Sequence, residues 1–297
     1  MKVARFAARE RTDYGIVMGE RIASKKELEE VFSQNLPEDI MDFISDANVR
    51  NIVEKKVSSI DHASLSISLA EVKLLAPIPR PPKIICLGLN YSDHAAEQRL
   101  EPPKEPVIFL KPRTALSGPF EDVVYPSIVK ELDYEGELAV VMGGKAKKVT
   151  PTESMKYIFG FMVFNDVSAR DIQFRDRQWT RGKSFDTFAP TGPWVVSREQ
   201  VGDHDDLRII TKVNGEVRQN SSTGLMYLKV PEIVSSLSHV MTLEPGDIIA
   251  TGTPSGVGFA IKPTPKFLSV GDVVDVEIER IGTIRNKVVA ESSSSQL

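Results

Sequence analysis

The segment 133–137 limits the possible folds of this chain more than any other, because three acidic residues alternate along it directly before the apolar run 139–142. Successive side chains of a β-strand point to opposite faces, so Asp133, Glu135 and Glu137 would share one face. The apolar run predicts a buried strand, which places at least Glu137 near the protein interior. A carboxylate in the interior has to be protonated, paired with a cation or bound to a metal ion. Any fold of this chain has to supply one of these three conditions.

A second apolar run, residues 158–164, ends abruptly at Asn165 and Asp166. If this run forms a strand beside the first, Asp166 comes within reach of Glu135 and Glu137. No Cys or His is nearby, and an all-oxygen ligand set suits Mg²⁺, Mn²⁺ or Ca²⁺ rather than zinc. The alternative is that the three carboxylates are ordinary solvated charges on an edge strand. The abrupt Asn-Asp pair after a core run, together with the cations downstream, favours the metal site.

Composition and charge exclude several classes of protein. With 37 Lys and Arg against 41 Asp and Glu, the net charge of −4 gives no indication of a nucleic-acid surface. No stretch of about eighteen uninterrupted apolar residues is present, so no membrane span is expected. The N-terminal residues 1–6 indicate a strand rather than a signal peptide. The single Cys86 excludes an internal disulfide framework, and a cytoplasmic protein is the expectation.

A proline-rich segment divides the chain. Four prolines between residues 77 and 82 cannot continue a helix or a central strand, so we place a domain boundary there. Residues 1–76 are expected to form a small α+β domain, residues 77–291 the catalytic domain, and the serine-rich residues 292–297 a disordered tail. Strand-like runs outnumber helical ones and no alternating βα units are evident. The sequence therefore predicts an α+β, β-dominated fold.

A short helix after this boundary carries a candidate acid/base pair. His94 and Glu97 are three residues apart and therefore lie on one face of the helix. A histidine can take or give a proton near neutral pH, and a carboxylate one turn away would orient it. Pro102, Pro103 and Pro106 follow, so the helix has few obligatory packing partners and is a candidate lid. The alternative is a solvated histidine on an exposed helix.

A glycine-rich turn, residues 251–258, follows a buried strand near the C-terminus. Its backbone N–H groups and the Thr253 hydroxyl are candidates to take a substrate carboxylate. No Gly-Lys-Ser/Thr sequence follows, so the turn is not a phosphate loop. The alternative is that the glycines only form a tight loop that needs positive φ angles. This interpretation is compatible with a carboxylate-binding turn.

Together these motifs resemble the fumarylacetoacetate hydrolase superfamily, over residues 77 to about 289. The matching motifs occur in the family's order, as Asn90-Tyr91-x-x-His94-x-x-Glu97, Glu135-x-Glu137, Asn165-Asp166-x-Ser168-Ala169-Arg170-Asp171, Lys183-x-Phe185-Asp186 and Thr251-Gly252-Thr253-Pro254-x-Gly256-Val257-Gly258. The resemblance implies a mixed β-roll catalytic domain, usually in a homodimer, with Mg²⁺ or Mn²⁺ held by Glu135, Glu137 and Asp166. It is closest to the subgroup that includes acylpyruvate hydrolases, oxaloacetate decarboxylases or tautomerases, and 2-hydroxyhepta-2,4-diene-1,7-dioate isomerases.

The resemblance also implies catalytic roles. His94 and Glu97 match a catalytic dyad carried on a lid helix. Lys183 resembles the family's active-site lysine, a second cation that holds a substrate oxygen or steadies a metal ligand. The alternative for Lys183 is an ordinary surface lysine.

Four further residues are candidate substrate contacts. Thr253 and Gly252 lie in the glycine-rich turn, whose hydroxyl and N–H groups are expected to hold the substrate. Arg170 and Gln173 follow Asp166 and are expected to contact either the substrate or the metal ligands. Arg170 could equally form a structural ion pair with Asp171 or Glu131.

The expected activity is that of a divalent-metal-dependent enzyme acting on small 2-oxo or enol acids through a metal-stabilised enolate. C–C hydrolysis of an acylpyruvate or decarboxylation of oxaloacetate ranks slightly first, because His94 and Glu97 form a pair able to activate water. The alternatives are isomerisation of 2-hydroxyhepta-2,4-diene-1,7-dioate and keto–enol tautomerisation of oxaloacetate. Two alternatives come from other classes: a non-catalytic dicarboxylate-binding protein and a structural, Ca²⁺-stabilised protein.

The segment 171–181 is more highly charged than the family's pattern. If this segment covers the site, Arg175, Arg177 and Arg181 would favour a second carboxylate on the substrate, as in oxaloacetate or a heptadienedioate.

Overall fold

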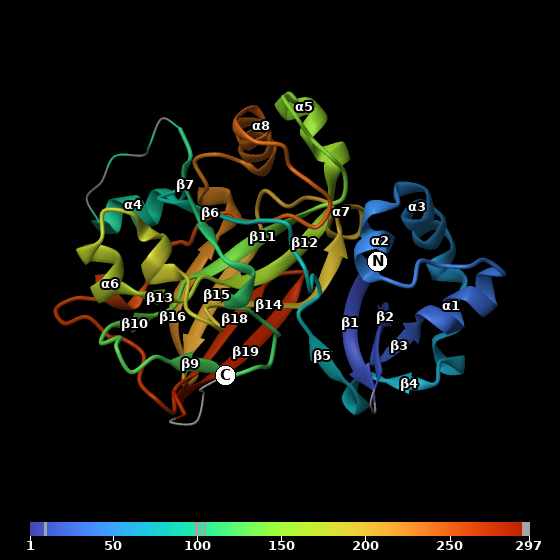
Figure 1. The fold of residues 1–297 in the computed structure, drawn as a ribbon, viewed down its shortest axis with the longest axis horizontal. Coiled ribbons are helices and arrows are strands. Elements are labelled where there is room, and N and C mark those ends of the chain that lie inside the picture. The colour runs from blue at the N-terminus through green and yellow to red at the C-terminus, as the bar shows by residue number, and fades with distance from the viewer. Residues whose placement is uncertain (9–10, 99–100, 102, 104, 293–297) are drawn as a thin grey trace.

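The computed structural model describes residues 1–8, 11–98, 101, 103 and 105–292. Its strands form two large sheets and one short pair, β10-β13 (Figure 1). The larger sheet has the order β4-β3-β2-β1-β14-β12-β11-β17-β6-β7, with β5 beside β1 and β8 beside β14, and the smaller sheet has the order β16-β15-β18-β19-β9. The strands are β1 (Lys2–Ala8), β2 (Arg11–Met18), β3 (Arg21–Ser24), β4 (Ile67–Ser68), β5 (Lys73–Leu75), β6 (Ile84–Gly88), β7 (Val107–Lys111), β8 (Leu116–Ser117), β9 (Val123–Tyr125), β10 (Leu132–Asp133), β11 (Gly136–Met142), β12 (Ile158–Asn165), β13 (Ser168–Ala169), β14 (Ala189–Ser197), β15 (Arg208–Val213), β16 (Glu216–Ser222), β17 (Ile248–Ala250), β18 (Val273–Ile278) and β19 (Gly282–Ala290). The helices are α1 (Lys25–Phe32), α2 (Ile40–Ser45), α3 (Ala47–Lys56), α4 (Ser92–Gln98), α5 (Pro151–Ser154), α6 (Arg170–Arg175), α7 (Arg198–Val201) and α8 (Val230–Val240), and short 3₁₀ turns include η6 (Trp179–Lys183) and η8 (Gly258–Ala260).

β11 and β12 lie in the middle of the larger sheet, and every residue of both strands is buried. They pair antiparallel, with Gly136 opposite Asn165 and Leu138 opposite Val163, and β17 pairs with the other edge of β11. Strands that have neighbours on both edges and cover on both faces expose no side chains, which explains why their sequences are continuous apolar runs. The predicted pairing of the two apolar runs is therefore confirmed.

The smaller sheet packs against one face of these central strands. A Cβ atom at Gly136 of β11 would lie 2.3 Å from Thr211 Oγ1 of β15 and 3.0 Å from Val276 Cγ1 of β18. Only a glycine allows the two sheets to approach this closely. The predicted α+β, β-dominated fold is confirmed, with the hydrophobic core lying largely between the sheets and under the surrounding helices.

The N-terminal part joins the larger sheet directly. Lys2 and Val3 of β1 pair with Val196 and Val195 of β14, and β5 also pairs with β1, so the sheet continues from residues 1–76 into the remainder of the chain. The predicted domain boundary at residues 76 and 77 stays a prediction. The predicted disordered tail, apart from its first residue, lies outside the described residues.

The helices lie around the sheets rather than between them. α5 and α8 lie side by side at the top of Figure 1, where Ser235 and Ser238 of α8 hydrogen-bond to the backbone of Val149. α4 and α6 lie on the left, at the end of the molecule away from the N-terminal elements. Within the part of the chain that the structure describes, no helix has the length and apolar character needed to cross a membrane.

We expect Gly160→Ala to destabilise the protein, because a Cβ atom there would lie 2.1 Å from the Val196 carbonyl oxygen of the neighbouring strand. A backbone atom within a sheet cannot move aside, so the strands would have to separate, at a cost of about 1–3 kcal/mol. Urea denaturation measures this cost. Gly224→Ala is the matched control, since the nearest atoms there belong to the side chains of Asp206 and Ser222, at 3.2 Å. Equal unfolding midpoints for the two variants would contradict the expectation.

Candidate active site

Three carboxylates meet at the ends of the two central strands. The ligand atoms of Glu135, Glu137 and Asp166 lie within 4.8 Å of one another, and all three residues are buried. Glu137 belongs to β11, Glu135 directly precedes this strand and Asp166 directly follows β12. The backbone N–H of Asp166 donates to the carbonyl oxygen of Glu135 at 2.8 Å, which holds the strand ends together. The structure thus brings the three predicted metal ligands to one place.

Glu137 is the carboxylate of this group that most needs a cation. Its Oε2 accepts a hydrogen bond from the backbone N–H of Gly252 at 2.9 Å, whereas its Oε1 is buried without a hydrogen-bond partner. Burial raises the pKa of Glu137 well above its ordinary value, and the charges of Asp166 and Glu135 raise it further. A hard cation satisfies a carboxylate oxygen of this kind. The residues therefore fit the predicted Mg²⁺ or Mn²⁺.

Lys183 and Arg170 neutralise the neighbouring carboxylates. Lys183 Nζ lies 2.9 Å from an oxygen of Glu135 and 2.9 Å from one of Asp166. Arg170 Nη1 donates to Glu135 at 2.5 Å. Burial by itself would raise the pKa of Glu135, but the charges of Lys183 and Arg170 lower it to about 2. Lys183 is therefore a buried cation of the site, and the alternative of a surface lysine is wrong.

Lys111, at the end of β7, is a buried cation that the sequence analysis missed. Its side chain is in an ion pair with Asp166 and donates to the carbonyl oxygen of Val167 at 3.1 Å. Burial lowers the pKa of Lys111, and the charge of Asp166 opposes this effect. The only signal in the sequence was a lysine that ends an otherwise apolar strand.

Asp133 holds other parts of the site and does not join the three-carboxylate group. Its oxygens accept from Arg170 Nε at 2.9 Å and from the backbone N–H groups of Gly258 and Phe259 at 2.8 and 3.1 Å. Asp133 therefore fixes the guanidinium group and the end of the glycine-rich turn together. Arg170 therefore forms ion pairs, but with Asp133 and Glu135 rather than with the expected Asp171 or Glu131.

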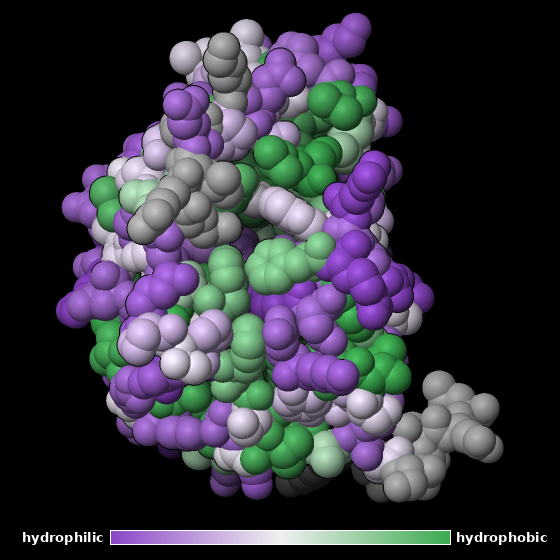
Figure 2. Space-filling view, turned by 90° about the vertical axis from the view of Figure 1, so that its left-hand side faces the viewer, coloured by the Kyte–Doolittle hydropathy of each residue, from purple (hydrophilic) through white to green (hydrophobic). Residues whose placement is uncertain are grey.

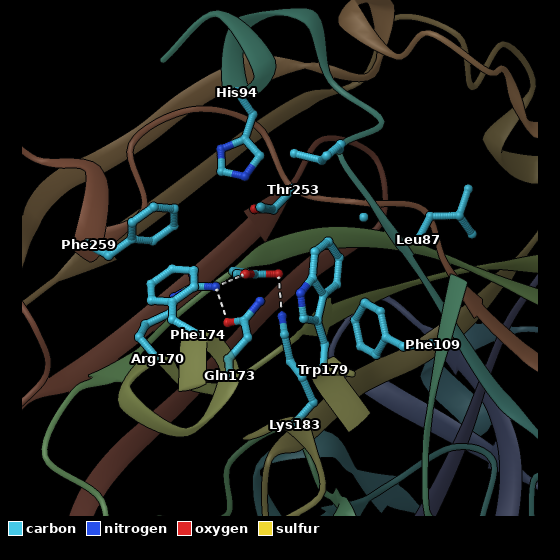
Figure 3. A pocket seen from close by; sticks show the side chains of 13 residues that line it. Leu87, His94, Phe109, Arg170, Gln173, Phe174, Trp179, Lys183, Thr253 and Phe259 are labelled. Carbon is cyan, nitrogen blue, oxygen red and sulfur yellow. Dashed lines mark hydrogen bonds and ion pairs between the residues drawn. The ribbon is translucent and has the colours of Figure 1, made fainter. Parts of the chain in front are cut away.

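A cavity of about 70 Å³ lies next to this group, with Glu135 in its lining. Figure 3 shows His94 on one side of it, facing Arg170, Gln173 and Lys183 across the cavity. Its remaining walls are largely apolar, and the lining residues are Leu87, Gly88, Leu89, His94, Phe109, Glu135, Arg170, Gln173, Phe174, Trp179, Lys183, Thr253 and Phe259. Figure 2 shows the side of the molecule on which α4 and α6 lie in Figure 1, and hydrophobic residues gather there between hydrophilic ones. The cavity thus has a charged floor and a largely aromatic wall.

His94 and Glu97 interact as the spacing predicts. His94 Nδ1 lies 3.3 Å from Glu97 Oε2, and the other oxygen of Glu97 accepts from the backbone N–H of Gly256 at 3.2 Å. The His94 ring meets Phe259 edge-on, with ring centroids 6.4 Å apart. Only 6% of His94 is exposed, so the alternative of a solvated histidine on an exposed helix is wrong.

The Thr253 hydroxyl is already used within the protein. It donates to the carbonyl oxygen of Gly136 at 3.0 Å and accepts from Gln219 Nε2 at 2.8 Å. The backbone N–H of Gly252 points to Glu137. In this arrangement Thr253 can offer the cavity a lone pair but not its hydroxyl proton. Gln219, a buried residue of β16 that the sequence analysis missed, orients this hydroxyl.

The arginines of the segment 171–181 do not reach the cavity. Arg181 pairs with Asp176 through Nε and Nη2, each at 2.5 Å. The Arg175 side chain is 64% exposed. Neither these two nor Arg177 lines the cavity. The structure therefore gives no support to the expectation that they bind a second substrate carboxylate.

Comparison with known proteins assigns the chain to a family. Residues 83–289 match the model for the fumarylacetoacetate (FAA) hydrolase C-terminal domain. The chain belongs to the fumarylacetoacetate hydrolase family. A mitochondrial oxaloacetate tautomerase of Bos taurus is 44% identical over 260 residues, which cover 87% of this chain and 82% of the relative.

Solved structures of related proteins share the whole fold. A 2-hydroxyhepta-2,4-diene-1,7-dioate isomerase from Mycobacterium marinum has a TM-score of 0.77 and 36% identity, covering 99% of this chain and 100% of that one. A maleylpyruvate hydrolase from Sphingobium sp. SYK-6, solved in complex with manganese(II) and pyruvate, has a TM-score of 0.78 and 31% identity, covering 98% and 100%. The family predicted from the motifs is confirmed.

We expect Glu137→Gln to stabilise the metal-free protein and to abolish its stabilisation by Mn²⁺. Because the folded-state pKa of Glu137 is raised above 4.5, the native protein binds this proton more tightly than the unfolded chain and loses stability as the pH rises above that value. Glutamine is neutral, so the variant does not lose this stability as the pH rises. Each kcal/mol of unfolding free energy that it retains raises Tm by about 2–4 °C. Calorimetry at about pH 5 and about pH 8, with and without MnCl₂, measures the effect.

The exposed Glu71→Gln is the matched control and should leave both the pH dependence and the Mn²⁺ response as in the wild type. A Glu137→Gln protein that melts below the wild type at the higher pH, or that Mn²⁺ still stabilises, would contradict the assignment of Glu137 as the unpaired carboxylate.

Proposed function

We propose that the protein is a divalent-cation-dependent enzyme acting on small 2-oxo acids and their enol forms. The observation that carries the proposal is that His94, with its partner Glu97, lines the same cavity as Glu135, one of three buried carboxylates that lie together. A histidine that is oriented by a carboxylate and faces a cavity can act as a general acid/base. A structural Ca²⁺ site has no need of such a pair.

Glu135, Glu137 and Asp166 would hold the cation, with Mg²⁺ and Mn²⁺ as the first candidates and Ca²⁺ as a further one. The cation supplies a fixed positive charge that polarises the carbonyl and carboxylate oxygens of a 2-oxo acid. Lys183 and Lys111 hold Asp166 in place from two sides. The manganese in the Sphingobium relative supports this assignment.

Arg170 and Gln173 are the proposed substrate contacts. Both line the cavity, and Arg170 Nη1 donates to Gln173 Oε1 at 2.9 Å. Arg170 Nη2 is buried without a hydrogen-bond partner, so it is a donor available to a substrate carboxylate. Thr253, through its remaining lone pair, is suited to accept a hydrogen bond from an enol hydroxyl or a water molecule. Gly252 contributes by holding Glu137.

Oxaloacetate is the substrate we propose to test first. Keto–enol tautomerisation, decarboxylation and C–C hydrolysis all pass a proton to or from C3 or water, a step that His94 can perform. The Bos taurus relative is named as an oxaloacetate tautomerase, and this name favours tautomerisation among the three reactions. Isomerisation of a heptadienedioate is favoured by the Mycobacterium marinum relative and is the second candidate.

We expect His94→Ala to lower kcat by about 10²–10⁴-fold without changing the affinity for Mn²⁺, because His94 moves the proton and does not hold the cation. The decay of enol absorbance measures tautomerisation, and pyruvate formation from oxaloacetate or acetylpyruvate measures C–C cleavage. His62→Ala, which alters an exposed histidine, is the control and should match the wild type.

Turnover that survives His94→Ala while only substrate affinity falls would overturn the enzyme proposal in favour of a non-catalytic dicarboxylate-binding protein. Consumption of neither acid by the metal-loaded wild type would move the proposal to the heptadienedioate isomerase.

The predicted homodimer and cytoplasmic location stay predictions. The Bos taurus relative is named as mitochondrial, so the location of this protein needs its own measurement by cell fractionation. Light scattering of the purified protein decides the oligomeric state.

A further inference from the structure

The helix that carries His94 is too short to hold itself in place. α4 has seven residues, Ser92–Gln98, and isolated helices of fewer than about 12 residues are marginal in water. Its position over the cavity therefore depends on contacts with the rest of the protein. Two of its carboxylates make such contacts, and His94 lies between them in the sequence.

The first carboxylate, Asp93, joins α4 to two distant segments. Its Oδ2 accepts a hydrogen bond from Ser221 Oγ of β16 at 2.7 Å and another from Ser255 Oγ of the glycine-rich turn at 3.1 Å. Its Oδ1 accepts from the backbone N–H of His94 at 2.8 Å. Hydrogen bonds to an ionised acceptor are stronger than neutral ones. One side chain thus ties the lid helix, the smaller sheet and the turn together.

The second carboxylate, Glu97, reaches the same turn. Its Oε1 accepts from the backbone N–H of Gly256, and its Oε2 lies beside His94 Nδ1. Asp93 and Glu97 therefore hold α4 to neighbouring positions of the turn, residues 255 and 256. Since Glu97 also contacts the histidine, its substitution cannot separate holding the helix from orienting His94. Asp93 does not line the cavity, so its substitution tests the holding of the helix alone.

We propose that Asp93 is a positioning residue that latches α4 to Ser221 and Ser255 and thereby places His94 over the cavity. The proposal rests on the proposed function of His94. His94 is only 6% exposed and lines the cavity, so a movement of α4 would widen access to the cavity. The latch consists of polar bonds at half-buried side chains, which can be exchanged for bonds to water at little cost. Breaking it opens the cavity, and re-forming it returns His94 to its place.

A purely structural role makes a different prediction. An acidic residue in the first turn of a helix stabilises that helix through the helix dipole alone, and this effect does not involve Ser221 or Ser255. Removing the two hydroxyls leaves Asp93, α4 and the metal ligands unchanged in sequence. The latch predicts that the double variant Ser221→Ala/Ser255→Ala behaves like Asp93→Ala, whereas the dipole effect predicts that it behaves like the wild type.

The experiment compares Asp93→Ala, Asp93→Asn, the double serine variant and the control Asp122→Ala, an exposed aspartate, each in the metal-loaded full-length protein. Hydrogen exchange read by mass spectrometry should be faster at residues 92–98 in Asp93→Ala and in the double variant, and unchanged at β11 and β12. The value of kcat on oxaloacetate should fall by about 10–100-fold, because a displaced catalytic group loses its alignment. Asp93→Asn keeps an acceptor oxygen and should retain part of the activity. Mn²⁺ affinity, measured by electron paramagnetic resonance, and Tm should match the wild type.

Each result that differs from these expectations contradicts one part of the proposal. Unchanged exchange at residues 92–98 overturns the latch, whatever the kinetics show. Faster exchange with unchanged kcat overturns the positioning role, and loss of Mn²⁺ binding in Asp93→Ala shows a structural role instead. A wild-type protein whose turnover is insensitive to His94→Ala overturns the proposed function, and the exchange data then still decide whether Asp93 holds the helix. The double serine variant keeps the test open if Asp93→Ala does not fold.

Discussion

The rest of the structure depends on the charge balance of one buried cluster. The charged groups of this cluster are the carboxylates of Asp133, Glu135, Glu137 and Asp166 and the cations of Lys111, Arg170 and Lys183, all of them buried. The cations form ion pairs with the other three carboxylates and not with Glu137. An uncompensated charge in the interior costs several kcal/mol, so one carboxylate of the cluster is left to be protonated or to bind a metal ion. This is the physical basis for a cation site in a cluster that otherwise pairs its buried charges.

The sheets determine where this cluster can be. β17 pairs only with residues 139–141 of β11, and among the described residues no strand continues the ladder along the rest of that edge. Side chains take its place: the Gly136 N–H donates to Gln219 Oε1 at 2.9 Å, and the Gly136 carbonyl oxygen accepts from the Thr253 hydroxyl. The site lies where the regular ladder ends, because there side chains and the glycine-rich turn can approach the backbone of β11. Since Gln219 belongs to the smaller sheet, both sheets contribute to the position of the metal-ligand candidates.

Sequence reasoning succeeded where a local pattern carries the information. The alternation of carboxylates before one apolar run, and the Asn165-Asp166 pair after another, were sufficient to predict that Glu135, Glu137 and Asp166 meet. The i, i+3 spacing placed His94 beside Glu97 because a helix is a local structure. The reasoning failed for Arg175 and its neighbours, since a charged segment gives no sign of whether it faces a cavity or, as here, pairs within itself and faces solvent.

By itself, the sequence determined which strands are buried, which carboxylates lie at their ends and which family the chain resembles, because these depend on residue order along single elements. Only the tertiary structure decided which cation neutralises which carboxylate, which residue orients the Thr253 hydroxyl and what holds α4 over the cavity. Asp93 and Ser221 are 128 positions apart in the chain. Their contact depends on how the smaller sheet packs against the larger one, and no pattern within either segment specifies it.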